Sequence, residues 1–504
     1  MTLGKTDGAL TALYKDPGSF RDPSGTVLHG GPRLFRAVSE TRRIQVLEFL
    51  VSDFYKKKAG RQIVETNVIP RAEIEKHFNI GETEKTIGCF LEHRKLSFIS
   101  YPYEWPFSLL KRAALAHLEL HLEALDHGFD MSDSSAFNIQ FEGINPIFVD
   151  TLSFRQYEPG SYWLGYKQFL EQFLCPLLLQ SHAGLKFNDW YRGTVNGIDL
   201  ISTSRALPIW TVLSPRIALH VHLHAWMMRK VRSESRGSRM KDRISKPLPA
   251  RSLRGLLSGL RDFTASLRPH KAGATYWENY AENTGYDTAE HDAKREAVSS
   301  FVKRAKPKCL LDLGCNTGEY SEIALAAGAR HVIAADSDLG TLEAVVSRAR
   351  KKQLNITPIY LDLGNPSPSQ GWGCCERSSI LERANADALI ALAVIHHLVI
   401  GGNVLLKMVV DLLVQLAPLG LIEFVPKSDP MVIGLLSHRE DIFPDYDIDN
   451  FRKALGSRAL IRKELVISKS GRTLFFFETF GRAHSSITDS SGDLATPPAS
   501  ADSA

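Results

Sequence analysis

The sequence contains little cysteine and no long apolar run. Its 504 residues include six Cys, which are scattered apart from the pair Cys374-Cys375 and form neither a disulfide framework nor a zinc-binding pattern. This usage suits a reducing compartment. No apolar run reaches the roughly 18 residues of a transmembrane helix, and the N-terminus lacks the apolar core of a signal peptide. We therefore expect a soluble, cytoplasmic protein with no membrane span.

A strong excess of charge is also absent. The net charge is +5, with 44% hydrophobic and 23% charged residues, which are ordinary values for a globular protein. The length allows two or three domains. The most basic segment runs from Arg229 to Lys271, with thirteen Lys/Arg against three acids. It lacks the interleaved aromatic residues of a nucleic-acid groove, so we interpret it as a linker and expect no nucleic-acid partner.

The common phosphate-binding glycine motifs are missing from the most informative stretch, KCLLDLGCNTGE. A P-loop requires G-x-x-x-x-G-K-[ST], and a dinucleotide fingerprint requires G-x-G-x-x-G. The chain instead has D-x-G-x-x-x-G, formed by Asp312, Gly314 and Gly318. The apolar run before the motif predicts a buried parallel strand, and the glycines predict a tight turn into a helix. An acid at Asp312 would repel a pyrophosphate but attract an ammonium group.

This stretch resembles motif I of the class I S-adenosyl-L-methionine (SAM)-dependent methyltransferases, with LLDLGCNTG in place of LDLGCGTG. Asn316 replaces the middle glycine, and Asn tolerates the left-handed backbone better than most residues. The resemblance implies that SAM is the cofactor and that Asp312, Gly314, Asn316 and Gly318 bind it. The alternative is a turn between a strand and a helix in some other doubly wound sheet.

The elements around the motif follow the order that this family implies. The second and third strands end in Asp336 and Asp362, for which the resemblance implies contacts with the ribose and the adenine. Upstream, Tyr286 is a candidate to pack over the sulfonium, as are Trp277 and Tyr280, because aromatic faces attract cations. Simple packing of these rings on the sheet is the alternative. ALIRKELVI and RTLFFFETF resemble the antiparallel pair that closes a seven-stranded, Rossmann-like methyltransferase sheet.

The fourth strand, ADALIALAVIHHL, leads to His396 and His397. Ligands bind at strand carboxyl ends in such sheets, so both histidines are candidates for the base that deprotonates a methyl acceptor. Successive residues of a strand point to opposite faces, so only one can face the donor. We favour His396, because His397 begins a helical continuation. The absence of a [DN]-P-P-[YF] signature argues against a nucleic-acid amine as the acceptor.

The N-terminal half carries a second group of polar residues. Asp133 and Asn138 stand at D-x-x-x-x-N spacing and Asp150 ends a later strand, an arrangement that resembles the catalytic loop and metal-binding Asp of kinase-like phosphotransferases. No glycine-rich phosphate loop precedes it, so a degenerate kinase-like scaffold or plain Asx turns are better interpretations than an active kinase. Alternating histidines at 220, 222 and 224 lack a neighbouring Cys or acid, and we predict no metal site.

Most of the chain resembles a set of bacterial SAM methyltransferases that includes the rhizobial nodulation proteins of the NoeA type, through SYPYEWPFSLLK, AVIHHL and IEFVPKSDP. The resemblance implies methylation of an acceptor such as a small molecule or a glycan-type signal. The alternatives are a phosphotransferase acting through the N-terminal domain and a non-enzymatic binding or scaffold protein. We predict an α+β domain, a basic linker, a methyltransferase domain and a disordered tail at residues 1–225, 226–270, 271–480 and 481–504.

Overall fold

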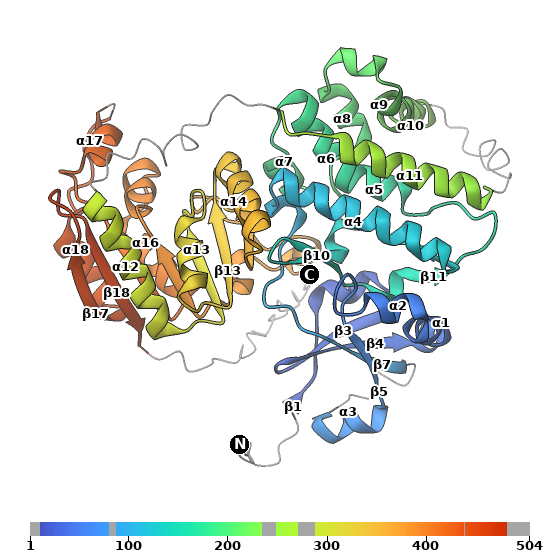
Figure 1. Cartoon of the computed structure of the whole chain (residues 1–504), viewed down its shortest axis with the longest axis horizontal. Helices are drawn as coiled ribbons and strands as arrows, with labels where there is room; N and C mark the ends of the chain where they lie inside the picture. The colour runs from blue at the N-terminus through green and yellow to red at the C-terminus, as the bar shows by residue number, and fades with distance from the viewer. Residues whose placement is uncertain (1–10, 80–86, 234–247, 271–287, 438, 481–504) are drawn as a thin grey trace, which may run out of the picture.

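The computed structural model describes residues 11–79, 87–233, 248–270, 288–437 and 439–480. These residues form two parts that lie side by side in Figure 1, an N-terminal part in blue to light green and a C-terminal part in yellow to red. None of the described helices combines the length and the apolar character that a bilayer crossing demands.

The C-terminal part is built on one seven-stranded sheet with the order β14-β13-β12-β15-β16-β18-β17. Neighbouring strands pair in parallel from β14 to β16, and β18 pairs antiparallel with both β16 and β17. The order reverses between β12 and β15, which opens a crevice at the strand carboxyl ends. The strands are β12 (Cys309–Leu313), β13 (His331–Asp336), β14 (Ile356–Tyr360), β15 (Ala388–Ala391), β16 (Leu419–Phe424), β17 (Ala459–Val466) and β18 (Thr473–Thr479).

Helices cover both faces of this sheet, which is why its central strands are buried throughout. Leu310 and Leu311 on β12 enter two separate apolar cores, one on each face. The Leu310 core continues into the N-terminal part. The helices are α12 (Thr288–Ala305), α13 (Glu319–Ala326), α14 (Leu339–Lys352), α15 (Ile380–Arg383), α16 (Leu406–Leu416), α17 (Pro430–Leu436) and α18 (Ile448–Gly456). The C-terminal part is therefore a Rossmann-like α/β unit.

The N-terminal part begins with a five-stranded antiparallel sheet of order β2-β3-β4-β7-β5. Its strands are β2 (Tyr14–Lys15), β3 (Gly25–Gly30), β4 (Arg33–Ser39), β5 (Thr66–Ile69) and β7 (Ile87–His93), with α1 (Glu40–Val51), α2 (Asp53–Lys58) and α3 (Arg71–His77) between them. A short parallel pair, β1 (Thr11–Ala12) and β6 (Phe78–Asn79), lies beside the sheet. This sheet and the helices after it form the expected α+β arrangement.

A helical region follows, centred on the buried helix α4 (Phe107–Asp126). Two small antiparallel pairs lie next to it: β8 (Phe129–Met131) with β11 (Phe154–Gln156), and β9 (Ile139–Glu142) with β10 (Asn145–Phe148). The remaining helices are α5 (Tyr166–Phe169), α6 (Cys175–Leu178), α7 (Asn188–Arg192), α8 (Leu200–Ala206), α9 (Pro215–Ile217) and α10 (His224–Ser233), with single turns between several of them.

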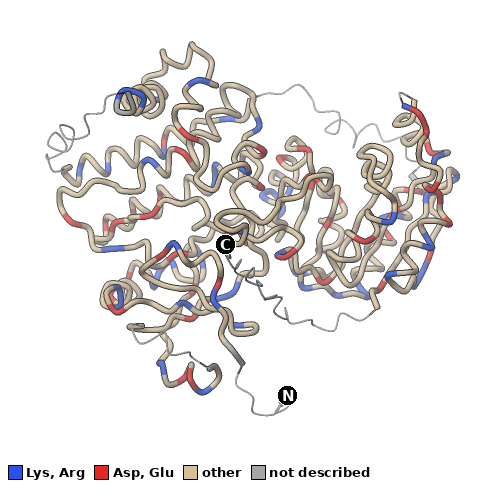
Figure 2. The backbone as a smooth tube through the Cα atoms, turned by 180° about the vertical axis from the view of Figure 1, so that it is seen from behind, with Lys and Arg blue, Asp and Glu red and all other residues tan. Residues whose placement is uncertain are grey.

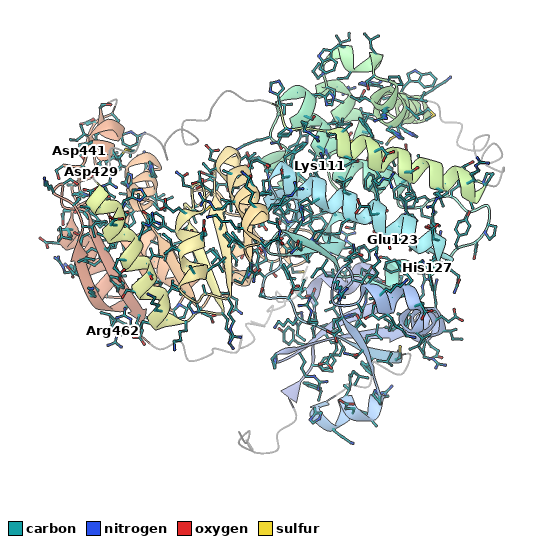
Figure 3. All side chains as sticks on the ribbon, viewed as in Figure 1. Lys111, Glu123, His127, Asp429, Asp441 and Arg462 are labelled. Atoms are coloured by element: carbon teal, nitrogen blue, oxygen red, sulfur yellow. The ribbon has the colours of Figure 1, made fainter. Side chains whose placement is uncertain are left out.

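The predicted linker needs a correction, because part of it is packed helix. Helix α11 (Ala250–Ser266) lies along α4 and buries Leu253, Leu257 and Leu260. At its end, the Lys111 ammonium of α4 donates to the carbonyls of Ala265 and Leu267 at 2.7 Å each (Figure 3). Residues 250–266 therefore belong to the N-terminal helical layer, while residues 234–247 and 271–287 of the expected linker and methyltransferase domain lie outside the described residues.

The two parts share a polar interface close to the end of β14, the edge strand of the seven-stranded sheet. The Lys186 ammonium donates to the Tyr360 hydroxyl at 2.8 Å, and that hydroxyl donates to Asp189 at 3.1 Å. Arg192 of α7 donates to the Asn365 carbonyl at 2.7 Å. These contacts bracket residues 361–364, so α7 and the residues beside it fix the loop that follows β14.

Candidate functional site

A cavity of about 480 Å³ opens at the carboxyl ends of the parallel strands. It is lined by the turn at 312–317, by the ends of β13 and β14 at 335–337 and 361–364, and by residues 392–394 after β15. Such a crevice, at the point where the strand order reverses, is where open α/β sheets bind their ligands. The volume suits a ligand of nucleoside size.

The turn after β12 has the backbone that the glycine motif predicts. Gly314 and Gly318 have φ of 68° and 77°, in the left-handed region. A Cβ at Gly314 would lie 2.7 Å from a methyl carbon of Val394, so a side chain there would collide with the residues after β15. Asn316 has φ of 48° and completes the turn in place of glycine, as expected. Its side-chain oxygen is buried at the cavity with no hydrogen-bond partner among the described residues.

Two carboxylates, the buried Asp312 and the partly buried Asp336, stand at the ends of the adjacent strands β12 and β13. Asp336 accepts one hydrogen bond on each oxygen, from the amides of Asn316 and Asp338 at 2.9 Å. Asp312 accepts from the Ser321 hydroxyl at 2.5 Å. Burial raises the pKa of Asp312 to about 7, and the Asp336 charge adds to the shift. Burial also raises the pKa of Asp336. The site therefore favours a ligand with a cation and hydroxyl donors.

A relative that covers 94% of the chain decides the family. Nodulation protein NoeA from Rhizobium meliloti (strain 1021) is 40% identical to this chain over 477 residues, which make up 94% of the chain and 98% of the relative. This chain belongs to the NoeA family. The family resemblance expected from the sequence is thereby confirmed. No family model matches the chain.

Solved structures resemble the C-terminal part of this NoeA-family protein only distantly. N-methyltransferase NodS from Bradyrhizobium japonicum WM9, in complex with S-adenosyl-L-homocysteine, is 10% identical with a TM-score of 0.30, covering 40% of this chain and 97% of NodS. WbdD is 16% identical with a TM-score of 0.28, covering 44% of this chain and 46% of WbdD. The Rossmann-like fold of the NoeA-family protein is established by its own strand order.

Of the other residues expected to bind the cofactor, the structure describes Asp362 and Gly318 but none of the three aromatic residues. Asp362 lines the cavity just after β14, where its carboxylate accepts from the Gly364 amide at 2.8 Å. Gly318 is the N-cap of α13 and sets the start of that helix. Tyr286, Trp277 and Tyr280 lie outside the described residues, so their roles remain predictions.

The two histidines after β15 lie in different environments. His397 lines the cavity, whereas His396 is 1% exposed and neither of its ring nitrogens has a hydrogen-bond partner among the described residues. Burial lowers the pKa of His396 far below its usual value, and burial also lowers the pKa of His397. His397, and not the favoured His396, is among the residues that line the cavity, and the role of either histidine as a base stays a prediction.

Helix α12 supplies two cavity residues that the sequence analysis missed, His291 and Lys294. The Lys294 ammonium lies 2.9 Å from Oε1 of Glu423, and Nη1 of Arg472 lies 3.3 Å from the same oxygen. Arg472 also pairs with Asp429, which Figure 3 labels at the outer end of the C-terminal part. The sequence shows Glu423 at the end of the fifth strand, but only the fold brings the cations to it. Lys294 joins this network of buried charges to the cavity.

The polar residues of the N-terminal part are held by one another. The Asn138 side-chain amide donates to Asp133 at 3.1 Å. Arg36 on β4 donates to Asp150, and its other amine donates to Asp22. Asp150 also accepts from the Leu152 amide at 3.2 Å. In this geometry each group stabilises the local backbone or neutralises a buried neighbour.

The alternating histidines are also held by protein groups. The Tyr166 hydroxyl lies 2.7 Å from His220 Nδ1 and 3.1 Å from His224 Nε2. His222 lies 2.9 Å from the hydroxyl oxygens of both Ser204 and Thr211. Among the described residues, no three His, Cys, Asp or Glu side chains are grouped as a metal site would require.

Affinity for SAM is expected to depend on pH through Asp312. Because burial holds its pKa near 7, the carboxyl group loses its proton as pH rises, and the contact predicted between Asp312 and the ligand ammonium requires the ionised form. Binding should therefore strengthen as pH rises through about 7 and level off above that value. Calorimetric titration between about pH 6 and pH 8 measures the change. The Asp312→Asn variant should bind more weakly and keep only the pH dependence of the ligand itself; an unchanged profile in this variant would contradict the assignment.

Proposed function

We propose that this NoeA-family protein is a SAM-dependent methyltransferase. The observation that carries the proposal is the pair of carboxylates, one buried and one partly buried, at two adjacent strand ends beside a left-handed glycine turn. Such a pair repels a pyrophosphate, which argues against a dinucleotide. It suits a ligand that presents an ammonium to Asp312 and ribose hydroxyls to Asp336.

The residues present fit SAM, and each would hold a different part of it. Gly314 lets the turn approach Val394, with which a Cβ would collide, so that both residues line the cavity. The N-terminus of α13, with its positive dipole end, suits the ligand carboxylate, and Asp362 at the end of β14 suits the adenine. Asn316 has a free side-chain oxygen to accept a hydrogen bond. When bound, SAM supplies an activated methyl group whose transfer needs no help with the leaving group.

The protein then has to position the acceptor and, for a hydroxyl or acid acceptor, take its proton. His397 is the base candidate, because it lines the cavity after β15. A lowered pKa keeps the imidazole neutral at neutral pH, which is the form that accepts a proton. The family relationship supports a small-molecule or glycan-type acceptor of the kind used in nodulation signalling.

A methyl-labelled SAM assay over small-molecule and glycan fractions tests the proposal, with the Asp336→Ala variant as the blank. Label above the blank is expected in one such fraction; label in none of them would contradict it.

Replacing Asp336 by alanine is expected to weaken SAM binding by about 1.5–3 kcal/mol, because a charged acceptor for the ribose hydroxyls is lost. Calorimetric titration of the full chain measures the affinity. The matched control is Asp338→Ala: Asp338 caps α14 by accepting from the Gly340 amide at 2.7 Å and is not among the cavity residues. The control should lose about 1 kcal/mol of stability but keep its SAM affinity. Equal affinities in the parent and in Asp336→Ala would place the site elsewhere.

For the N-terminal part we propose a degenerate kinase-like scaffold that does not transfer phosphate. Arg36 lies on the third strand of its five-stranded sheet, where protein kinases place a lysine that faces the nucleotide phosphates. Both amines of Arg36 are taken by Asp150 and Asp22. A cation neutralised by two carboxylates attracts no triphosphate, and Asn138 is turned toward Asp133.

A further inference from the structure

The N-terminal part contains a second cavity, of about 410 Å³, which shares no lining residue with the candidate SAM site. It lies between α4, the turn that follows α2 and the hairpin formed by β9 and β10. Helix α4 contacts β10, and the two elements can be followed side by side in Figure 1. A cavity of this size is large enough for a small organic molecule.

The walls of this second cavity are tied to one another by hydrogen bonds. The Phe148 amide of β10 donates to the Gln62 carbonyl at 2.8 Å, and the Val64 amide donates to the Phe148 carbonyl at 2.8 Å. Across the cavity, Nε of Arg112 on α4 donates at 2.9 Å to the Ile144 carbonyl in the hairpin turn. The cavity is therefore formed by the fold itself, as most small-molecule sites are.

A buried histidine in the wall of the cavity has unused hydrogen-bonding groups. His117 of α4 lines the cavity and is 0% exposed. Neither of its ring nitrogens has a hydrogen-bond partner among the described residues, whereas buried polar groups are normally paired. Burial lowers the pKa of His117 to about 3, so the ring is neutral and offers one donor and one acceptor. A hydroxyl group, which also donates and accepts, is its natural complement.

The rest of the inner wall is apolar. Leu120, Ile139 and Phe148 line the cavity and are buried. The Phe148 ring centre lies 6.2 Å from that of His117. An apolar wall with a single imidazole suits a compact ring or aliphatic body that carries a hydroxyl group.

The outer wall of the cavity carries charges that are mostly positive. Arg61 and Glu119 are exposed and Arg112 is partly buried. Burial, and then the charge of Arg350 on α14, lower the pKa of the Arg112 guanidinium, so a further cation is near. Figure 2 shows basic and acidic residues interspersed over the described chain as a whole. Guanidinium groups bind carboxylates and phosphates through paired N–H donors, so this wall suits an anion.

The spacing along α4 indicates the size of the ligand. Arg112 and His117 are five residues apart, which is about 7.5 Å along a helix axis. A six-membered ring with an anionic group and a hydroxyl at opposite ends has about this length. We propose that the second cavity binds a small ring compound whose carboxylate or phosphate contacts Arg61 and Arg112 and whose hydroxyl contacts His117. This site is independent of the proposed methyltransferase activity.

Calorimetric titration of the full chain with matched probes tests the proposal. The probes are para-hydroxybenzoate, para-hydroxyphenyl phosphate and para-hydroxybenzyl alcohol, which share a ring and a hydroxyl and differ in charge. We expect saturable binding of at least one anion, and the tighter of the two identifies the anionic group. The uncharged alcohol should bind at least about tenfold more weakly. Failure of both anions to bind, or equal affinity for the alcohol, would overturn the proposal.

A variant of the buried histidine tests the end of the site that holds the hydroxyl. His117→Phe removes both ring nitrogens and keeps a ring beside the aromatic neighbours Phe169 and Phe173. In the parent, the tighter anion should bind about tenfold better than the same compound without its hydroxyl, which is benzoate or phenyl phosphate. In His117→Phe the two compounds should bind equally. A preference for the hydroxyl that persists in this variant would overturn the proposal.

A variant of the exposed arginine tests the end that holds the anion. Arg61→Ala should bind the tighter anion about tenfold less. The matched control is Arg43→Ala, which removes a side chain of α1 that is 41% exposed and lies 2.8 Å from Glu40, and it should bind like the parent. Thermal melts check that each variant folds. Equal affinity of Arg61→Ala and the parent would overturn the proposal. So would a loss of anion binding in Asp336→Ala, because the anion would then occupy the SAM site.

Discussion

Replacing Glu423 by alanine is expected to lower the free energy of unfolding by about 3–5 kcal/mol, the usual effect of breaking a buried ion pair from one side. Glu423 is fully buried at the end of β16. Its carboxylate neutralises Lys294 and Arg472, whose side chains are only 3% and 5% exposed. Removing the carboxylate takes the Glu423 charge away from the buried Lys294 ammonium, whereas Arg472 keeps its ion pair with Asp429. Urea denaturation followed by circular dichroism measures the change.

The control for this prediction is an exposed ion pair in the same part of the chain. Glu464 lies 2.9 Å from Arg452, and their side chains are 33% and 41% exposed. Because water solvates both groups, Glu464→Ala should cost no more than about 1 kcal/mol. If the two variants lose equal stability, the buried network is not a stabilising feature of the site.

Replacing His397 by asparagine is expected to lower turnover by roughly 10²–10⁴-fold, the usual contribution of a general base. SAM affinity should stay unchanged, because the expected ligand contacts come from the turn after β12 and from Asp336. Since burial lowers the pKa of His397, the neutral base persists to lower pH. Activity of the parent should therefore rise through a pH below the ordinary imidazole value of about 6.5. Initial rates against pH, with the acceptor fraction that takes up the label, measure both effects.

His396 provides the comparison for this prediction. It is the neighbouring residue, and its ring centre lies 4.1 Å from that of His397, but it is buried and does not line the cavity. His396→Asn should keep the shape of the pH profile, with any loss appearing as lower thermal stability. Full turnover in both single variants across the pH range would show that positioning alone carries the reaction.

The motif turn and the acids at the strand ends could be predicted because their signals are local. Asp312, Gly314 and Gly318 lie within one short stretch, and their spacing fixes both the turn and the position of the acid. The choice between His396 and His397 could not be made in the same way. Strand β15 ends at Ala391, and Ala393 has φ of 55°, so strand alternation no longer applies at the histidines. A left-handed alanine leaves no signal in the sequence.

The sequence also could not predict which residues far apart in the chain contact one another in the fold. Lys294 reads as one charge among many on a polar helix, and only the packing of α12 on the sheet brings it to Glu423. Similarly, the apolar spacing of α11 was visible, but its partner α4 lies far earlier in the chain. The basic composition of residues 226–270 suggested a linker. A pattern of charge does not reveal that another helix covers the apolar face of α11.

Calorimetric titration of the full chain with SAM, and separately with Mg-ATP, tests whether the protein binds SAM at the ends of β12 and β13 or binds a nucleotide through its N-terminal part. We expect saturable binding of one SAM per chain, with a lower affinity in the Asp336→Ala and Asp312→Asn variants. It predicts no binding heat with Mg-ATP, because Arg36 is neutralised by Asp150 and Asp22. Saturable Mg-ATP binding together with no response to SAM would contradict the account and assign the activity to the N-terminal part.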